Sequence, residues 1–374
     1  IGHDADLCAE YAARATESDR EDEILMLDKL NAKITRAQER IESIYNDTDG
    51  RCYLSFSGGK DSTVILALIK QCEGLLTIPP GAIPAVFNDT GIELGATAEF
   101  VRWVQENWYN NVITIRHDPR DSFDWILKNK GKPIKSKLKS ENLGKWKRNP
   151  DNPFYLKQLL GDNTGRYKNT MIADHDLHFL HPDFDIKVDN KCCQFLKKKP
   201  FDKWSRENFM KGNMTGERAA EGGARLANMQ ARVRAGGTAC TRTKGNMIVK
   251  LPIVDWTDED VDEFIKTYNV PLSKAYTVYG ADRTGCIGCP FAGQHLAQSL
   301  KALYSYEPLR YKAALHWLKD VYIAQDVVLP FDPEYEKERK EKWETMYGQM
   351  RYEMILKYRP EKMKKWDHRQ EELF

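Results

Sequence analysis

The chain has 374 residues, a formal net charge of +2, and ordinary shares of hydrophobic (41%) and charged (30%) residues. This length can bury a large core, and the composition excludes a mainly disordered chain. No apolar run is long enough to cross a bilayer and no signal peptide precedes the first charged residues, so we expect a cytoplasmic protein without a membrane partner. Eight cysteines without a secretory signal favour free thiols or metal ligands over disulfides.

Predicted helices and strands alternate in the first third of the chain. Residues 20–46 have the apolar stripe of an amphipathic helix. The expected strands are 51–56, 82–89 and 111–118, and the helices between them are 61–72 and 96–108. This order predicts an α/β fold with a doubly wound, mostly parallel sheet, and further helical segments at both ends of the chain.

Residues 128–150 carry nine Lys or Arg side chains and one acid, together with proline and glycine. This composition predicts a mobile surface insertion. Two interpretations stay open. The segment is either a solvated lysine-rich loop or a nucleic-acid contact, in which the lysines bind phosphates and Trp146 stacks on a base.

The second half of the chain is predicted to be mainly helical. Residues 251–270 predict a strand followed by a helix, with Thr257 as its N-cap and Asp260 completing a capping box. From about residue 296 onward the pattern is helical. One face of the last long helix is apolar and is expected to be core or subunit interface; it comprises Trp343, Tyr347, Met350, Met354 and Tyr358.

The stretch S-G-G-K-D-S (57–62) connects the first predicted strand to an apolar helix. Its two glycines allow backbone N–H groups to approach phosphate oxygens. Lys60 and the helix N-terminus supply positive charge, and the two serines add hydroxyl donors. It is not a Walker loop, because Leu54 and Asp61 occupy the positions of that motif's first glycine and its Ser/Thr. An ordinary tight strand–helix turn is the alternative.

Two further polar segments accompany this loop. The turn at 88–91 follows the second strand, so it should face the same crevice as the loop, although a plain Asp/Gly turn explains it as well. In T-G-E-R-A-A-E-G-G-A-R (215–225), helical spacing brings Arg218, Glu221 and Arg225 together. A surface helix with ion pairs is the alternative for this second segment.

Two cysteine pairs lie far apart in the chain, one adjacent (Cys192, Cys193) and one spaced as CxxC (Cys286, Cys289). Four thiolates suit tetrahedral zinc or a [4Fe–4S] cluster. An adjacent pair is awkward for one zinc ion but can hold two corners of an iron cube, so we favour the cluster. Zinc and unliganded thiols stay open. Basic side chains that would offset the cluster's charge are Lys197, Lys198, Lys199 and Arg283.

These motifs resemble those of known enzymes. S-G-G-K-D-S after an alternating strand matches the PP-loop of the ATP pyrophosphatase superfamily. The turn at 88–91 and the segment 215–225 resemble its phosphoadenosine phosphosulfate (PAPS) reductase-like branch, although Gly222 replaces a usual serine. The CC…CxxC pattern with its basic tail is similar to adenylylsulfate (APS) reductases, and most of all to the iron–sulfur PP-loop proteins of DNA phosphorothioation.

The resemblance implies an adenine nucleotide alpha hydrolase-like fold that binds ATP with Mg²⁺ and cleaves it between the α- and β-phosphates. It implies catalytic roles for Lys60, for Asp61 as an aid in holding Mg²⁺, and for Arg218. The implied nucleotide- and pyrophosphate-binding residues are Ser55, Ser57, Gly58, Gly59, Lys60, Asp61, Ser62, Asn88, Asp89, Thr90, Gly91, Arg218 and Arg225. Cys240 is a candidate sulfur carrier, with a small buried hydrophobic residue as the favoured alternative.

Two features distinguish this sequence from PAPS and APS reductases. No cysteine follows Cys289, whereas those reductases carry a thiol near the C-terminus, and Lys60 is retained where APS reductases tend to lose it. The expected function is therefore ATP-dependent sulfur transfer to a nucleic acid, with a cysteine desulfurase or another sulfur donor as partner; an oligomer is compatible with the sequence. The alternatives are a sulfonucleotide reductase that uses an external thiol, and a nucleotide-binding redox regulator without catalysis.

Three consecutive segments are expected on this basis. They are an N-terminal helical segment (1–49), a PP-loop nucleotide-binding domain (50–275), and a C-terminal helical region with the CxxC pair (276–374).

Overall fold

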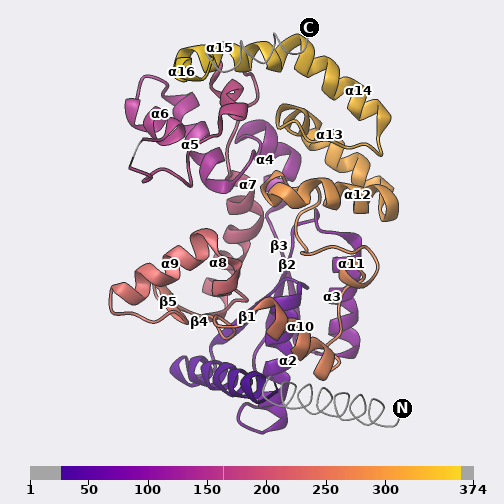
Figure 1. The fold of residues 1–374 in the computed structure, drawn as a ribbon. Coiled ribbons are helices and arrows are strands. Elements are labelled where there is room, and N and C mark those ends of the chain that lie inside the picture. The colour runs from indigo at the N-terminus through magenta and orange to yellow at the C-terminus, as the bar shows by residue number, and fades with distance from the viewer. Residues whose placement is uncertain (1–26, 163, 364–374) are drawn as a thin grey trace, which may run out of the picture. The chain divides into compact units, whose positions relative to one another are not determined.

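The structure is a computed structural model that describes residues 27–162 and 164–363 (Figure 1). Cys8 and the first residues of the helix expected over 20–46 lie outside this range. The chain divides into two compact units, each assembled from separate stretches. The first unit comprises Ile1–Phe87, Glu99–Thr114 and Ser205–Ser273, and the second comprises Asn88–Ala98, Ile115–Trp204 and Lys274–Phe374. The three consecutive segments expected from the sequence stay a prediction.

Six strands form one sheet in the order β3-β2-β1-β4-β6-β5. The strands are β1 (Cys52–Phe56), β2 (Ala85–Asp89), β3 (Val112–Arg116), β4 (Gly212–Met214), β5 (Thr241–Lys244) and β6 (Met247–Lys250). Strand β1 is parallel to β2 and β4, β4 is parallel to β6, and β5 is antiparallel to β6. The mostly parallel α/β sheet predicted from the sequence is confirmed.

The core of the first unit is built around β1 and the helix that follows it. Residues 27–47 are helical, and the further helices that lie wholly or partly in this unit are α2 (Lys60–Gly74), α3 (Gly95–Asn107), α8 (Lys199–Glu207), η4 (Ala219–Glu221), α9 (Gly223–Arg234) and α10 (Asp258–Thr267). Helix α2 is buried on nearly every side, as expected for a helix packed against a parallel sheet. Leu54 of β1 and Leu66 of α2 are fully buried in this core.

One boundary in the first unit differs from the prediction. The strand β6 ends at Lys250, and residues 252–255 form turns instead of the expected strand. Pro252 has no N–H group to donate to a strand ladder, which explains why pairing stops here. The capped helix that follows is confirmed, because the Thr257 hydroxyl accepts from the Asp260 N–H at 3.2 Å and the Asp260 carboxylate accepts from the Thr257 N–H at 2.6 Å.

The second unit is mainly helical. Its helices are η1 (Pro119–Asp121), α4 (Phe123–Asn129), α5 (Lys137–Arg148), α6 (Pro153–Leu160), η2 (Asp174–Leu180), α7 (Lys191–Cys193), η3 (Gln194–Lys198), α11 (Lys274–Thr277), η5 (Pro290–His295), α12 (Leu296–Tyr306), α13 (Pro308–Ala324), α14 (Pro333–Lys342), η6 (Trp343–Tyr347), α15 (Gly348–Tyr358) and α16 (Pro360–Met363). Tyr347, Met350 and Met354 are buried in its core. The apolar stripe of the last helix is therefore core, one of the two roles expected for it.

Residues 128–150 are not the mobile insertion that their charge predicted. They contain the end of α4 and all of α5, and in α5 Leu143, Gly144 and Trp146 are buried. Trp146 is only 8% exposed and packs in the core of the second unit, so the proposed stacking of its ring on a base is wrong. The number of charged residues was a poor guide to mobility, because an amphipathic helix can carry many lysines on its outer face while its inner face packs against the core.

Among the described residues, no helix combines the length and the apolarity needed to cross a bilayer.

Candidate functional site

The predicted phosphate loop lies in the first unit, between β1 and the N-terminus of α2. Gly58 has a φ of 68°, a left-handed conformation that favours glycine, and Gly59 is the N-cap of α2. The Ser57 and Ser62 hydroxyls lie 3.0 Å apart, and the Ser62 hydroxyl also accepts from the Ser57 N–H and donates to the Gly59 carbonyl. These bonds fix the turn at the N-terminus of α2, which carries a partial positive charge.

Lys60 and Asp61 are the first two residues of α2, and they form ion pairs with different partners. The Lys60 ammonium donates to Asp262 of α10 at 2.9 Å, and the lysine side chain is 32% exposed. Asp61 accepts from the Arg218 Nε at 2.8 Å. Burial raises the pKa of Asp61, and the charge of Arg218 opposes that rise. The loop thus presents one cation and one carboxylate, both held by the first unit.

Arg218 is buried, and it joins the loop to α10. Besides Asp61 its guanidinium donates to Asp258 at 2.5 Å and to the Trp256 carbonyl at 3.4 Å. Close approach of the two segments requires Gly216, because a Cβ there would lie 2.8 Å from the Cβ of Asp61. In this structure Arg218 therefore acts as a positioning residue for Asp61.

The remaining predicted residues of the first unit lie around this network. The Ser55 hydroxyl donates to Asn213 of β4 at 2.8 Å. Arg225 forms an ion pair with Glu221, the surface pairing that the sequence left open. Cys240 is half-buried. Burial raises the pKa of its thiol, but hydrogen bonds with Thr238 and Thr241, together with nearby positive charges, lower the pKa overall.

The turn at 88–91 belongs to the second unit, where it contacts the segment that carries the first cysteine pair. The Asn88 amide donates to the Leu196 carbonyl at 2.7 Å, while its buried Oδ1 has no hydrogen-bond partner. Asp89 pairs with Arg116 at 2.9 Å and accepts from the Gly91 N–H at 3.0 Å. A common crevice for this turn and the loop at 57–62 stays a prediction.

Thr90 leads to a buried carboxylate that the sequence did not reveal. Both the hydroxyl and the N–H of Thr90 donate to Glu93, at 2.5 and 3.0 Å. Glu93 forms a β-bridge with Cys286, and burial raises the pKa of its carboxyl. The spacing of Thr90 and Glu93 was the available signal, because a Thr three residues before a Glu can bond to it locally.

The four cysteines of the two pairs line one small cavity of about 20 Å³ in the second unit. Cys192 and Cys193 come from α7, and Cys286 and Cys289 from the turn before η5. Gly288 is the residue that allows this turn, since its φ is 55° and a Cβ would lie 2.2 Å from the Tyr322 hydroxyl. The remaining lining residues are Ile92, Phe123, Pro133, Leu196, Lys197, Ile287, Pro290 and Leu318.

The charges of this cavity are coupled. Burial raises the pKa of Cys289 to about 12, and burial also raises the pKa of Cys286. A hydrogen bond from Cys192 lowers the pKa of Cys193 to about 6. The pKa of the half-buried Lys197 is raised, chiefly by the negative charge of Cys286. Thiolates buried together repel one another, so a positively charged metal centre is what would stabilise four of them here.

The four cysteine thiols are the type of ligand that a four-thiolate metal centre requires. In the described part of the chain, however, no group of three or more His, Cys, Asp or Glu side chains is arranged as it stands to hold a metal ion. All four thiols line the same cavity, next to the cation of Lys197, and the choice between a cluster and zinc stays a prediction. Binding either of them would require the thiols to turn toward a common centre.

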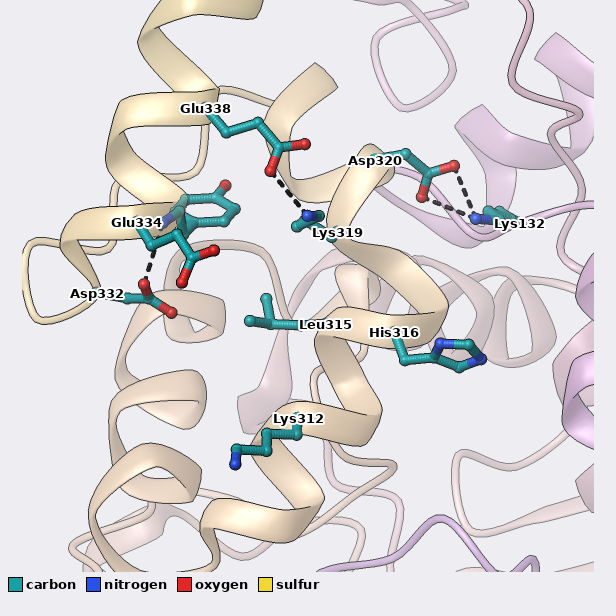
Figure 2. Close-up of a pocket in the computed structure, with 10 residues that line it drawn as sticks. Lys132, Lys312, Leu315, His316, Lys319, Asp320, Asp332, Glu334 and Glu338 are labelled. Atoms are coloured by element: carbon teal, nitrogen blue, oxygen red, sulfur yellow. Dashed lines mark hydrogen bonds and ion pairs between the residues drawn. The ribbon is translucent and has the colours of Figure 1, made fainter.

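A larger groove of about 460 Å³ lies between α13 and α14 of the second unit (Figure 2). Figure 2 shows two ion pairs in it: Lys319 donates to Glu338 at 2.7 Å, and Lys132 donates to Asp320 at 2.7 Å. No predicted site residue lines this groove. Because its charges largely compensate each other, we assign no chemistry to it.

Sequence reasoning missed two carboxylates of the first unit, Asp258 and Asp262, which pair with Arg218 and Lys60. The capping box at Thr257 was the available signal. It fixes the start of α10 and thereby places both aspartates in the first two turns of that helix.

Comparison with known proteins gives one family. The model of the phosphoadenosine phosphosulfate reductase domain matches residues 51–146 and 162–292, more than half of the chain. A search of curated proteins gives no match. A similar solved structure is phosphoadenylyl-sulfate (PAPS) reductase from Candida auris in its phosphate complex, with 16% identity, a TM-score of 0.39, and 67% of this chain and 87% of that chain covered. On the family match, this chain belongs to the phosphoadenosine phosphosulfate reductase domain family.

Proposed function

We propose that this protein is an adenylylating ATP pyrophosphatase that carries a [4Fe–4S] cluster and transfers sulfur to a nucleic acid. The observation that carries the proposal is the loop before α2, where backbone N–H groups, two serine hydroxyls and Lys60 meet at a helix N-terminus. Such a loop favours a multiply charged anion. The ion pair of Lys60 with Asp262 keeps the ammonium at the loop, and a phosphate group would take the place of the carboxylate.

The first step would transfer the adenylyl group. ATP binds with Mg²⁺, and Asp61 helps to hold the ion. An oxygen of the acceptor attacks the α-phosphorus, the bond to the β-phosphate breaks, and pyrophosphate leaves while the acceptor's proton passes to solvent. Lys60 and the helix N-terminus stabilise the charge that develops on the leaving group. Arg225 would complete the nucleotide contacts of the first unit, and it would first have to exchange Glu221 for a phosphate.

The second step would replace the activated oxygen by sulfur. Hydrosulfide from a cysteine desulfurase or another donor bonds to the acceptor atom, and AMP leaves. Cys192, Cys193, Cys286 and Cys289 would hold the cluster, which supplies sulfur handling and electron transfer when bound. Lys197 offsets part of the thiolate charge. Cys240, with its lowered pKa, is a candidate carrier of the sulfur.

One experiment tests the iron–sulfur cluster and the ATP cleavage separately. After anaerobic purification, iron and acid-labile sulfide are measured, and pyrophosphate release is assayed with ATP, a sulfide source and DNA or tRNA. The wild-type protein should contain four iron and four sulfide per chain and should release pyrophosphate. Lys60→Ala should keep the iron and lose the release. Cys286→Ser should lose the iron. Release at the wild-type rate by Lys60→Ala would remove the loop from the mechanism.

Reduction of PAPS or APS is a second candidate, and the family match favours it. The protein would then need an external thiol such as thioredoxin. Release of sulfite from either sulfonucleotide by the pure protein with thioredoxin would establish this reaction and exclude the leading proposal. Tight ATP binding without release of pyrophosphate or sulfite, under all of these conditions, would instead indicate a nucleotide-binding regulator.

A further inference from the structure

Residues 88–93 form one short segment that contacts both cysteine-bearing segments of the second unit. The first pair (Cys192, Cys193) and the second pair (Cys286, Cys289) lie far apart in the chain, yet both line the same cavity. The segment bonds to η3, which directly follows the first pair, and to the turn that carries the second pair. It therefore connects the two pairs within the second unit, a role that the proposed chemistry does not include.

Asn88 holds the backbone that follows the first pair. Its amide Nδ2 donates to the Leu196 carbonyl at 2.7 Å and to the Lys197 carbonyl at 3.4 Å. Both of these residues belong to η3, a π-helical turn that begins directly after Cys193, and both line the cysteine cavity. Asn88 is only 8% exposed, so water competes little for its hydrogen bonds. The buried amide therefore fixes the position of the turn to which the first pair is attached.

The other end of the segment holds the turn with the second pair through its backbone. The Ile287 N–H donates to the Ile92 carbonyl at 2.7 Å. Next to this bond, Glu93 and Cys286 form an antiparallel β-bridge. The carboxylate of Glu93 keeps the segment in shape, because it accepts from both the N–H and the hydroxyl of Thr90. Glu93 is buried as well, so these local bonds are shielded from water.

Holding the backbones matters because the four thiols, all in the described part of the chain, are not arranged around a metal ion as they stand. A cysteine side chain turns by rotation about one torsion between staggered positions, which does not move the backbone. Thiolates that lie close together repel one another before a metal ion binds, and this repulsion tends to separate the two pairs. Bonds from a third segment to both pairs oppose that separation, so that only the side chains have to turn.

We propose that Asn88 and Glu93 are positioning residues for the cysteine centre, Asn88 for the first pair and Glu93 for the second. Asn88 then serves the thiols instead of the nucleotide to which the resemblance assigned it. The inference deepens the proposed function by naming the residues that shape its metal site, and it rests on that function for the identity of the bound metal. The positions of the thiols themselves depend on neither ATP nor iron.

Alkylation of the reduced, metal-free full chain, followed by mass spectrometry, tests each contact separately. Asn88→Ala should speed alkylation of the first pair at least about fivefold, because the loss of one buried hydrogen bond favours local opening by about this factor. It should leave the second pair nearly unchanged. Glu93→Ala should do the reverse. The buried thiols Cys52 and Cys72 of the first unit are internal controls and should stay unreactive in both variants.

Titration with Co²⁺ alone measures the consequence for metal binding, since tetrahedral Co²⁺ with thiolate ligands has characteristic visible absorption bands. Asn88→Ala and Glu93→Ala should each weaken Co²⁺ binding at least about tenfold, as the loss of groups that orient metal ligands does. Glu93→Gln keeps an oxygen that can accept from Thr90 and should restore most of the affinity.

Trp343→Phe is the matched control. Trp343 also donates to a backbone carbonyl of the second unit, that of Ile323, at 2.7 Å, and neither residue lines the cysteine cavity. The control loses a bond of the same kind and should bind Co²⁺ within about twofold of wild type.

Four results would overturn the inference. They are equal acceleration of alkylation at both pairs by either Ala variant, wild-type Co²⁺ affinity in both Ala variants, equal weakening in Trp343→Phe, and absence of the Co²⁺–thiolate bands from the wild-type protein. Failure of the proposed function looks different. If the alkylation and Co²⁺ results hold but the protein forms no iron–sulfur cluster and releases no pyrophosphate, the positioning roles stand and the proposed function fails.

Discussion

Arg218 connects two carboxylates that lie far apart in the sequence, Asp61 and Asp258. The guanidinium is 7% exposed and Asp61 is 29% exposed, so the ion pair between them is shielded from solvent, whereas Asp258 is mostly exposed. Removing one partner of a shielded pair costs far more than removing a surface pair, because the other charge is left without compensation. Arg218 and Arg225, seven residues apart, therefore differ in what they contribute to stability.

Arg218→Ala should reduce the free energy of unfolding by about 2 kcal/mol, less than for a fully buried pair because Asp258 stays hydrated. Arg225→Ala removes an ion pair whose arginine is 45% exposed and should cost only about 0.3 kcal/mol. Denaturant unfolding of both variants measures the difference. Equal losses would show that Arg218 does not hold Asp61 in the folded protein.

His178 is the second residue whose burial sets a measurable property. It is fully buried in the second unit, and its Nε2 donates to the Ala324 carbonyl at 2.7 Å. Burial lowers its pKa to about 3, and the charges of Lys135 and Arg351 also disfavour the protonated ring.

The stability of the second unit should fall as the pH falls through the ordinary histidine range. Between about pH 6.5 and pH 3 the unfolded chain binds a proton at His178 that the folded chain does not, so acid favours unfolding. From pH 7 to pH 5 this residue alone should cost about 2 kcal/mol. His178→Gln keeps a donor for Ala324 and does not titrate. Unfolding measured at both pH values should give a smaller difference for this variant, and an equal difference would contradict the assignment.

At the scale of elements, α5 separates what the sequence could predict from what it could not. The strand–loop–helix around Lys60 was predictable because its residues interact with near neighbours, and the local pattern of β1 and α2 determines the turn. Helix α5 was not, because the nine-to-one basic composition of residues 128–150 hides an inner face whose partners lie about 40 residues further along. The division of the chain into two units could likewise not be predicted from the sequence, since each unit combines stretches that lie far apart in the chain.

The same contrast holds within the candidate site. The sequence pointed to four cysteines that could share one centre, and all four line one cavity. It gave no sign that Glu93 is buried beside them or that Asp262 pairs with Lys60, because both contacts depend on how separate elements pack. Local motifs reveal the reactive side chains, whereas the charged groups around those side chains depend on how separate elements pack.

Gly144 of α5 gives the element-scale prediction. Alanine favours a helix over glycine by about 1 kcal/mol, but a Cβ at Gly144 would lie 2.4 Å from the Val188 carbonyl oxygen. Gly144→Ala should therefore destabilise the protein by about 1–3 kcal/mol, as overpacking does. Gly74 at the end of α2 has no atom within 4 Å of the same Cβ, so Gly74→Ala should be neutral or slightly stabilising. Thermal unfolding of both variants decides; stabilisation by Gly144→Ala would show that α5 does not pack on Val188.

For the whole molecule, the two units have separate hydrophobic cores and separate candidate sites. The phosphate loop belongs to the first core, and the cysteine cavity belongs to the second. A ligand stabilises the structure that it binds by an amount set by its concentration relative to Kd, about 2.7 kcal/mol at a hundredfold excess. Two different ligands should therefore protect two different sets of backbone amides.

Hydrogen exchange with ATP and Mg²⁺, and separately after anaerobic iron and sulfide loading, measures this protection. ATP at about a hundredfold excess over Kd should slow exchange up to about a hundredfold at 57–62 and at 216–221, because Gly216 and Arg218 contact the loop. Iron loading should slow exchange at 192–198 and 286–290. Lys60→Ala should lose the first protection and keep the second, and Cys286→Ser should do the reverse. If Lys60→Ala lost both, or if iron protected 57–62 instead of the cysteine segments, the assignment of one ligand to each unit would be wrong, because protection follows the core to which the binding residues belong.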